Sequence, residues 1–386
     1  MLRTGIYIGW VGYLNLGDEA MYQLCRNQFP GIRWSRMEDV TYELHPADIL
    51  RRSQRDPTQI LQALTEELST QRRLRSVATK SLQELARLAG RQVAIFGGGT
   101  LINRNVAALE SYVSIRKRTG RLVPTFGTGV INPAFWSTRE VGWIDRRKEW
   151  VSVLAELPVV GVRGPISKAL LDDAGAGNVV VCADPAVAFH APYAAKPLPA
   201  RRDGPLRIGL NPGDCSGHLW GRMEDVQDSF VALSRWLNQS GHHIEIIPVW
   251  QKDVESCLEV ARRAELDASV VRPVCYTHET FLSRVENLDL MVCLKLHAGV
   301  LAAAANIPFV SLEYQPKCRD FAASLQWEEF VIRTDEIAPA KLIDTVVALI
   351  AQLDSKRPEL CRNMCELMNR FDAYCRQIAP IMLRSA

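Results

Sequence analysis

The chain has 386 residues, which is too long for one ordinary hydrophobic core and fits two domains. Hydrophobic residues make up 47% and charged residues 23%, the balance of a folded globular protein and not of a disordered one. Lys and Arg exceed Asp and Glu by 46 to 43, a net charge of +3 that is too small for a surface devoted to nucleic acid. No apolar run approaches the roughly 18 residues of a membrane span, and the N-terminal residues read as a strand, not as a signal peptide.

The ten cysteines show neither C-x-x-C pairs nor histidine neighbours at the spacing of a zinc site. Cys182, Cys275 and Cys293 lie inside apolar runs, where cysteine usually acts as a small core side chain. Cys361 and Cys365 lie one helical turn apart, and we interpret them as packing residues because no third ligand is near in the sequence. The sequence therefore predicts a cytoplasmic, reduced protein without metal or cofactor.

Short apolar strands alternate with amphipathic helices along most of the chain, which is typical of parallel α/β units. A proline-rich stretch at 189–205 interrupts this alternation and predicts a linker. The strands are expected before it at 5–10, 32–37, 92–97, 122–127, 158–162 and 178–182, and after it at 206–211, 243–249, 269–275, 289–294, 308–313 and 329–332.

Two runs of about six strands predict two Rossmann-like α/β domains that face a central cleft. The expected domains are 1–195 and 205–345, followed by helices at 346–386 that cross back to the first domain. Residues 41–91 form a mostly polar helical insertion, in which 51–91 carries nine Lys or Arg against four acids. That segment is either a solvated helical face or a basic surface that meets anionic lipid headgroups or a diphosphate-bearing substrate. The second reading implies a peripheral position at the inner membrane face.

Ligands of open parallel sheets bind at the carboxyl ends of the strands, so the loops there are the candidate sites. After the first strand, Gly17 allows a tight turn, and Asp18 falls in the first turn of a helix. This arrangement is either a capped helix or a way to direct Asn15 and Asp18 into the cleft, with Asp18 as a base or as an acceptor for a sugar hydroxyl.

Glycines at the end of the third strand offer backbone N–H groups to an anion or allow close approach of a ligand. They are Gly97, Gly98 and Gly99, and they match neither G-x-G-x-x-G nor a Walker A sequence. Arg163, at the end of the fifth strand, is placed either for a forked contact with phosphate or carboxylate or for an interdomain salt bridge. Asp184, after the sixth strand, is expected to cap a helix or brace the linker.

Polar side chains also follow the strands of the second half. We interpret His297 as a catalyst and not as a structural histidine, because cations and an acid share the carboxyl ends of adjacent strands with it. The candidates around it are Asn211, Asp214, Lys295, Leu296, Glu313, Tyr314 and Lys317.

Taken together, these motifs resemble the polysaccharide pyruvyl transferase family. The residues that carry the resemblance are 12–20, 96–103, 162–171, 183–185, 295–308 and 314–317. The resemblance implies a GT-B-like fold and an enzyme that moves pyruvate from phosphoenolpyruvate, as co-substrate, onto a sugar diol as a cyclic ketal. The acceptor would be a saccharide of an exopolysaccharide or of the cell envelope, free or lipid-linked, with the first domain on the acceptor side and the second on the donor side.

The resemblance also implies roles for single residues. Arg163 matches the arginine that holds the donor phosphate, His297 the essential histidine, Lys317 a functional lysine and Asp18 the acid of the first glycine loop. The family usually has R-L-H where this chain has Lys295, Leu296 and His297. Lysine keeps the charge but loses the two-pronged grip on phosphate.

The implied chemistry needs no metal. His297 would protonate the methylene carbon of the donor, and the cations Arg163, Lys295 and Lys317 would neutralise its phosphate and carboxylate. Asp18 or Asp214 would accept the proton of the acceptor hydroxyl.

Two other functions remain open from the sequence. One is a nucleotide-sugar-dependent GT-B glycosyltransferase or epimerase, in which Glu313 would hold a ribose. The other is a non-catalytic sugar-binding relative, for which Lys295 is the sequence feature in favour.

Overall fold

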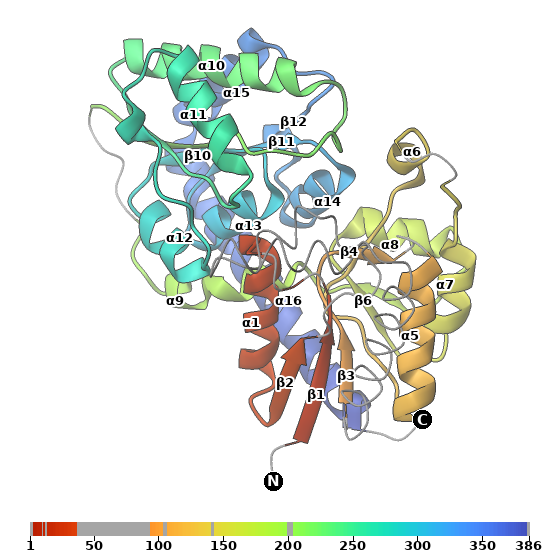
Figure 1. Ribbon diagram of the computed structural model, residues 1–386. Coiled ribbons are helices and arrows are strands. Elements are labelled where there is room, and N and C mark those ends of the chain that lie inside the picture. Colours follow the sequence, from red (N-terminus) through yellow and green to blue (C-terminus); the bar gives the residue numbers. More distant parts are fainter. Residues whose placement is uncertain are drawn as a thin grey trace, which may run out of the picture.

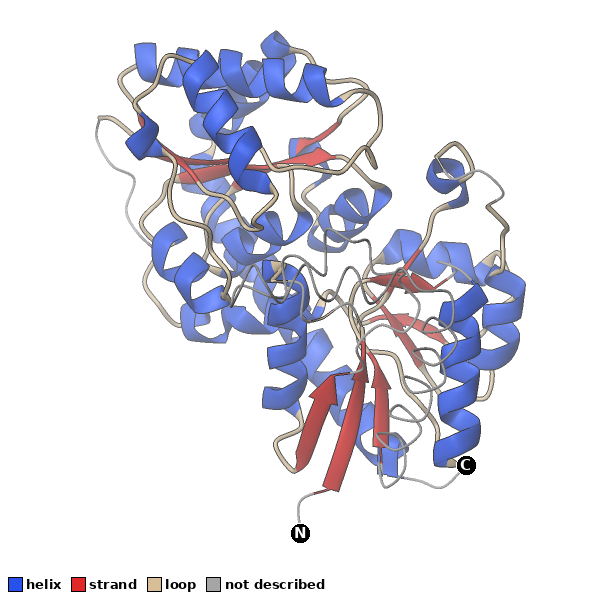
Figure 2. Ribbon diagram, viewed as in Figure 1, coloured by secondary structure: helices blue, strands red, loops and turns tan. Residues whose placement is uncertain are grey.

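The computed structural model describes residues 3–9, 11, 14–36, 93–102, 106–139, 143–198 and 204–383. These residues form two α/β lobes, in which parallel strands lie between helices (Figures 1 and 2). The expected helical insertion at 41–91, with its basic segment, lies outside the described residues.

The first lobe is built on parallel pairing. Strand β1 (Arg3–Ile8) lies between β2 (Ile32–Arg36) and β3 (Val93–Phe96). Single parallel bridges, Phe96 to Thr125 and Thr128 to Val162, carry the pairing on to the later strands. These are β4 (Thr100–Ile102), β5 (Gly129–Val130), β6 (Val160–Val162) and β7 (Val179–Val181).

The second lobe has one five-stranded sheet in the order β12-β11-β10-β8-β9, and all its pairs are parallel. Val271 adds a parallel bridge at Ile246, beside β9. This order, which reverses beside the first strand, is that of a doubly wound Rossmann-like sheet. Its strands are β8 (Arg207–Asn211), β9 (His243–Ile246), β10 (Leu290–Cys293), β11 (Phe309–Glu313) and β12 (Val331–Arg333).

Helices cover both faces of the sheets (Figure 2), which explains why central strands such as β3 and β10 are apolar and buried throughout. In the first lobe they are α1 (Leu16–Gln28), α5 (Val106–Thr119), α6 (Pro133–Trp136), α7 (Arg147–Leu154) and α8 (Pro165–Asp172). The short helices η1 (Pro185–His190) and α9 (Ala191–Ala194) begin the stretch between the sheets. The second lobe adds α10 (Met223–Gln239), α11 (Asp253–Arg263), η2 (Ala268–Val270), α12 (His278–Val285), α13 (Leu296–Ala304), α14 (Pro316–Leu325), η3 (Glu328–Phe330) and α15 (Pro339–Ala351).

The last helix, α16 (Leu353–Leu383), spans both lobes (Figure 1). Near its start, Arg357 donates a hydrogen bond to the carbonyl oxygen of Asp289 in the second lobe, at 2.9 Å. Near its end, the hydroxyl of Tyr374 donates to the carbonyl oxygen of Thr125 at 2.8 Å and accepts from the N–H of Gly161 at 3.0 Å in the first lobe. The predicted return of the C-terminal helices to the first domain is confirmed. Within the described residues, no helix is both long and apolar enough to cross a bilayer.

Candidate active site

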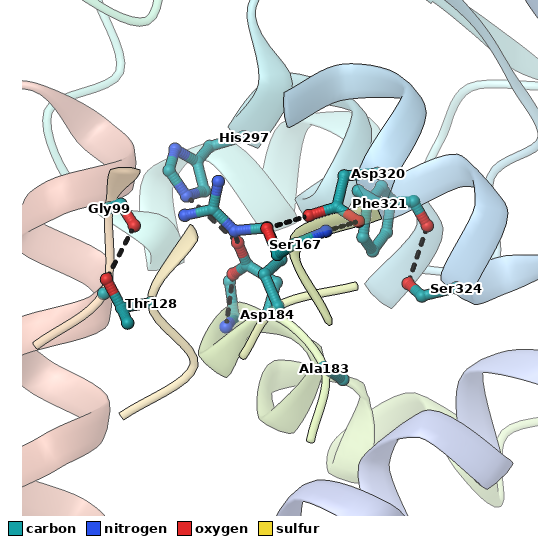
Figure 3. Close-up of polar contacts among 12 residues, drawn as sticks. Gly99, Thr128, Ser167, Ala183, Asp184, His297, Asp320, Phe321 and Ser324 are labelled. Carbon is teal, nitrogen blue, oxygen red and sulfur yellow. Dashed lines mark hydrogen bonds and ion pairs between the residues drawn. The ribbon is translucent and has the colours of Figure 1, made fainter. Parts of the chain in front are cut away.

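The site lies where the carboxyl ends of the two sheets meet. Asp184, which follows β7, places a carboxylate oxygen 2.7 Å from Nε of Arg163, which follows β6. The same oxygen is 3.7 Å from Nε2 of His297, in the first turn of α13 of the second lobe. Figure 3 shows His297 and Asp184 facing each other across the lobe boundary. Two lobes thus contribute to one charged cluster.

Asp184 remains ionised although it is fully buried. Burial acts to raise the pKa of its carboxyl group, but the positive charges of Arg163 and His297 outweigh that effect and lower the pKa to about 2. Its other oxygen accepts a hydrogen bond from the N–H of Ala186 at 2.9 Å and caps η1. One oxygen of Asp184 therefore caps η1, while the other lies beside Arg163 and His297.

Several polar atoms around this cluster lack a hydrogen-bond partner within the described part of the chain. They are Nη1 of Arg163, Nε2 of His297 and Oγ1 of Thr100, all of them buried. A β-carbon added to Gly129 would lie 3.3 Å from Oγ1 of Thr100 and 3.5 Å from Nη1 of Arg163, so these two atoms border the same point. Buried donors without partners are costly, and their gathering here is typical of a site that a polar ligand completes.

Close packing between the lobes requires a glycine at position 17. A β-carbon there would stand 1.8 Å from Nδ1 of His297, which leaves no room for any side chain. Asn15 caps α1 by accepting a hydrogen bond from the N–H of Gly17 at 3.2 Å, and the N–H of Leu16 reaches the carbonyl oxygen of Val249 in the second lobe at 3.3 Å. Asn15 and Gly17 thus shape the start of α1 to receive the imidazole.

Two titratable groups beside the cluster have pKa values near neutrality. Burial raises the pKa of Asp18 to about 6, although His297 and Lys317 act to lower it. Burial also lowers the pKa of Lys317 to about 8, and repulsion from Arg163 adds to the decrease. Asp18 and Lys317 affect each other's pKa, which indicates that they lie within electrostatic reach across the lobe boundary.

Lys295 occupies a separate polar cluster in the second lobe. Its ammonium group donates to the carbonyl oxygen of Asp214 and lies 3.5 Å from the buried carboxylate of Asp253. Its backbone N–H donates to the side chain of Asn211, and Leu296 is buried after it. The carboxylate of Asp214 accepts from both the N–H and the hydroxyl of Ser216. Asn211, Asp214 and Lys295 thus order the loop after β8, while Arg163 and His297 gather at Asp184.

The glycines after β3 pack against protein atoms. A β-carbon at Gly97 would lie 2.2 Å from the ring of Tyr7, and one at Gly98 would lie 2.0 Å from the sulfur of Met21. Gly99 has φ +101°, a left-handed conformation that glycine adopts without strain. Within the described residues, the space beside Gly97 and Gly98 is therefore filled by the side chains of Tyr7 and Met21, where the sequence suggested a ligand.

Glu313 is also occupied by a protein partner, Arg319. Its carboxylate lies 2.6 Å from Nε of Arg319, and burial raises its pKa against the lowering effect of that arginine. The side chain is buried at the end of β11. A ribose at this carboxylate would have to compete with the ion pair.

The lobes are also joined by a helix cap that the sequence does not reveal. Asp320 of α14 accepts hydrogen bonds from the N–H groups of Ile166 and Ser167 at 2.8 and 3.2 Å, and from the Ser167 hydroxyl at 2.6 Å (Figure 3). It thereby caps α8, which starts directly after Arg163 and Gly164. Gly164, the residue before α8, has no side chain that could cap the helix, and this is the only hint in the sequence that another residue does so. It does not indicate that this residue is Asp320.

The arrangement defines the class of protein as GT-B-like. No curated protein sequence matches the chain. Solved structures with the same fold include S. aureus MnaA with UDP, at 11% identity and TM-score 0.54, covering 100% of this chain and 98% of that one. A glycosyltransferase from Rickettsia africae has 10% identity and TM-score 0.55, with coverage of 100% and 99%. The UDP-GlcNAc 2-epimerase of Neisseria meningitidis has 12% identity and TM-score 0.51, with coverage of 99% and 100%.

Within that class, the sequence itself identifies the family. A family model described as polysaccharide pyruvyl transferase matches residues 15–316, most of the chain. The protein belongs to the polysaccharide pyruvyl transferase family, as the resemblance of its motifs implies. The matched range includes Asp18, Arg163, Asp184 and His297.

Proposed function

We propose that the protein transfers a pyruvyl group from phosphoenolpyruvate to two hydroxyls of a saccharide, forming a cyclic ketal. The observation that carries the proposal is the buried cluster at the lobe boundary, where Arg163 and His297 flank Asp184 and Nη1 of Arg163 has no hydrogen-bond partner among the described residues. Family membership supports a pyruvyl transferase, and the residue chemistry supports this donor.

Phosphoenolpyruvate carries a phosphate and a carboxylate, so its site must supply positive charge. Nη1 of Arg163 offers a directed N–H in a buried setting, where a charge-assisted hydrogen bond to phosphate is strong. Lys317 offers a second cation, since its pKa of about 8 leaves most of it charged at neutral pH. We assign donor binding to Arg163 and Lys317, with Thr100 as a further hydroxyl ligand. Lys295 supports the site through the loop after β8, because its ammonium group is already paired.

The reaction proceeds by addition and then substitution. His297 gives a proton to the methylene carbon of the donor, C2 becomes electrophilic, and one acceptor hydroxyl adds to C2. A second hydroxyl then attacks C2 and its proton passes to the leaving phosphate, as the bond from C2 to the phosphate oxygen breaks with its electrons going to phosphate. Asp184, whose carboxylate faces Nε2, acts as a positioning residue for His297.

Asp18 is our candidate for the general base. Its pKa of about 6 leaves it mostly ionised at pH 7 yet basic enough to accept a proton from a sugar hydroxyl. Asp214, the other candidate, uses both carboxylate oxygens to hold Ser216. The geometry therefore favours Asp18 as the base and gives Asp214 a structural role.

We further propose that the reaction occurs in the cytoplasm, where phosphoenolpyruvate is made. The acceptor would be a precursor of an exopolysaccharide or of the cell envelope, in free or lipid-linked form. Vesicle flotation of the full chain with anionic lipid tests whether it also meets a membrane surface.

The deciding experiment compares two donors. Purified protein is incubated with phosphoenolpyruvate and candidate saccharides, and released phosphate and the pyruvyl methyl signal are measured by colorimetry and NMR. We expect one ketal for each phosphate, and stabilisation against heat by phosphoenolpyruvate. Stabilisation by a nucleotide sugar alone would instead favour a glycosyltransferase or epimerase. Binding of saccharide without turnover of either donor would indicate the non-catalytic relative.

A further inference from the structure

A cluster of metal-binding side chains lies away from the charged site. His190 ends η1, and Cys361 and Cys365 lie on one face of α16. Their ligand atoms, one imidazole nitrogen and two sulfurs, all lie within 4.8 Å of one another. The fold therefore supplies the third ligand that is absent from the local sequence around the two cysteines.

The spacing of these atoms suits a tetrahedral ion. Bonds of about 2.3 Å to sulfur and about 2.0 Å to nitrogen separate a sulfur and a nitrogen on one Zn²⁺ by about 3.6 Å. Nε2 of His190 lies 3.3 Å from Sγ of Cys365. This pair is therefore within a few tenths of an ångström of the separation that a shared tetrahedral ion gives.

His190 is already oriented as a ligand. Its Nδ1 lies 2.9 Å from the carbonyl oxygen of Ala304, and because a carbonyl only accepts, Nδ1 must carry the hydrogen. Nε2 then presents its lone pair to the sulfurs. A backbone carbonyl that fixes the tautomer is the usual support of a metal-bound histidine. Burial lowers the pKa of His190, which favours the neutral form that binds metal.

We propose that His190, Cys361 and Cys365 form a Zn²⁺ site. Binding releases the two thiol protons, and the two thiolates then balance the charge of the ion, so the site is neutral where the imidazole is buried. Cys361 and Cys365 are half-buried and thus partly exposed to solvent. Three protein ligands leave the fourth position for water or an added ligand.

A zinc ion at this site would link η1, which follows the last strand of the first lobe, to α16, which contacts both lobes. His190 lies six residues after Asp184, on the segment that leaves the first sheet. The cysteines lie on the helix that contacts both lobes. Bound zinc would fasten this segment to α16 independently of the reaction proposed above.

Cobalt provides the test, because Co²⁺ occupies zinc sites and its thiolate complexes absorb light. The full-length protein, kept reduced, is titrated with Co²⁺ and then with Zn²⁺. We expect about one equivalent of Co²⁺ to give a thiolate-to-cobalt band that Zn²⁺ abolishes. Cys361→Ser and Cys365→Ser should each lower the affinity at least tenfold, whereas Cys375→Ala, on the same helix but outside the cluster, should not.

A His190→Gln variant should also lose Co²⁺ binding, but His190 is buried and the variant could fail to fold. The two cysteine variants decide the test in that case. Reduced wild-type protein with a native circular dichroism spectrum and no cobalt–thiolate band would overturn the proposal. So would folded Cys361→Ser and Cys365→Ser variants that bind Co²⁺ as tightly as the wild type. These readouts do not involve pyruvyl transfer, so failure of one proposal leaves the other intact.

Discussion

Asp184 sits between the guanidinium of Arg163 and the imidazole of His297 and is fully buried. Its charge stabilises Arg163 and His297, and they in turn keep its pKa near 2. Pairs of this kind contribute little when complete, but loss of one partner leaves an uncompensated buried charge. The cluster is therefore more sensitive to substitution than its distances alone suggest.

Asp184→Asn keeps the shape of the side chain and removes its charge. We expect the free energy of unfolding to fall by about 3–5 kcal/mol, because Arg163 loses its partner while 1% exposed. Denaturant unfolding measures the loss. Asp172→Asn, which removes an exposed partner of Lys168, is the control and should change stability by less than about 1 kcal/mol. Equal effects of the two substitutions would contradict the buried pair.

His297→Gln tests the proton donor. We expect turnover to fall by about 10²- to 10⁴-fold, because a carbon atom must receive a proton from a positioned acid. Binding of phosphoenolpyruvate should change little, since Arg163 and Lys317 remain. The measurement is deuterium incorporation into the pyruvyl methyl group in heavy water. Protonation at the wild-type rate would show that another residue is the acid.

Asp18 and Lys317 should each contribute a limb to the pH dependence of activity. It should rise as pH passes about 6, where Asp18 loses its proton and becomes a base. It should fall above about 8, where Lys317 loses the charge that holds the donor. In the Lys317→Arg variant, the fall in activity should move to a higher pH, because arginine stays protonated. An unchanged alkaline limb in that variant would exclude Lys317 as its source.

The cap that Asp320 places on α8 joins helices of different lobes, and its loss can be measured directly. Asp320→Ala leaves three donors of α8 without an acceptor, and we expect a loss of about 1–3 kcal/mol in the free energy of unfolding. The KM for phosphoenolpyruvate should also rise, because α8 begins two residues after Arg163. Asp320→Asn, which keeps the acceptor oxygen, should recover most of both effects. A variant with native stability and KM would show that water replaces the cap.

Most of the elements could be predicted because fully buried parallel strands are short apolar runs. The expected strands at 122–127 and 269–275 pair through single bridges instead. Each contains a proline, Pro124 or Pro273, that has no N–H for a regular ladder. Strand β4 was not predicted, because its three residues directly follow three glycines.

The site could be predicted only in part. Arg163 and His297 follow strands, so local sequence places them at the carboxyl ends of their sheets. Their meeting at Asp184 depends on how two lobes dock, and no local pattern encodes that. Lys295 shows the same limit, since Asp253, which holds it, lies 42 positions earlier in the chain.

Helix α16 holds the two lobes together. Phe371 packs edge-on against Phe126 of the first lobe, with ring centroids 5.2 Å apart, and Tyr374 bonds to the backbone beside it. A β-carbon at Gly161 would lie 2.3 Å from the Tyr374 ring, so the first sheet is shaped to receive this helix.

Ending the chain after Arg370 removes these contacts. Loss of the Phe371 ring alone costs about 3–5 kcal/mol, so we expect the first lobe to unfold well before the second. Calorimetry should show two transitions in place of one. A chain that ends after Leu383 keeps both aromatic contacts and serves as the control. A single transition in the shorter chain would mean that other contacts couple the lobes.

The fit of His297 against Gly17 also limits how the gene can recombine. A chimera that joins the second half of this chain to the first half of a relative will work only if that relative has no side chain at the matching position. Even alanine would collide with the imidazole. The two halves of such a chimera must therefore match at this contact, and one substitution at the start of α1 would displace an imidazole encoded 280 codons downstream.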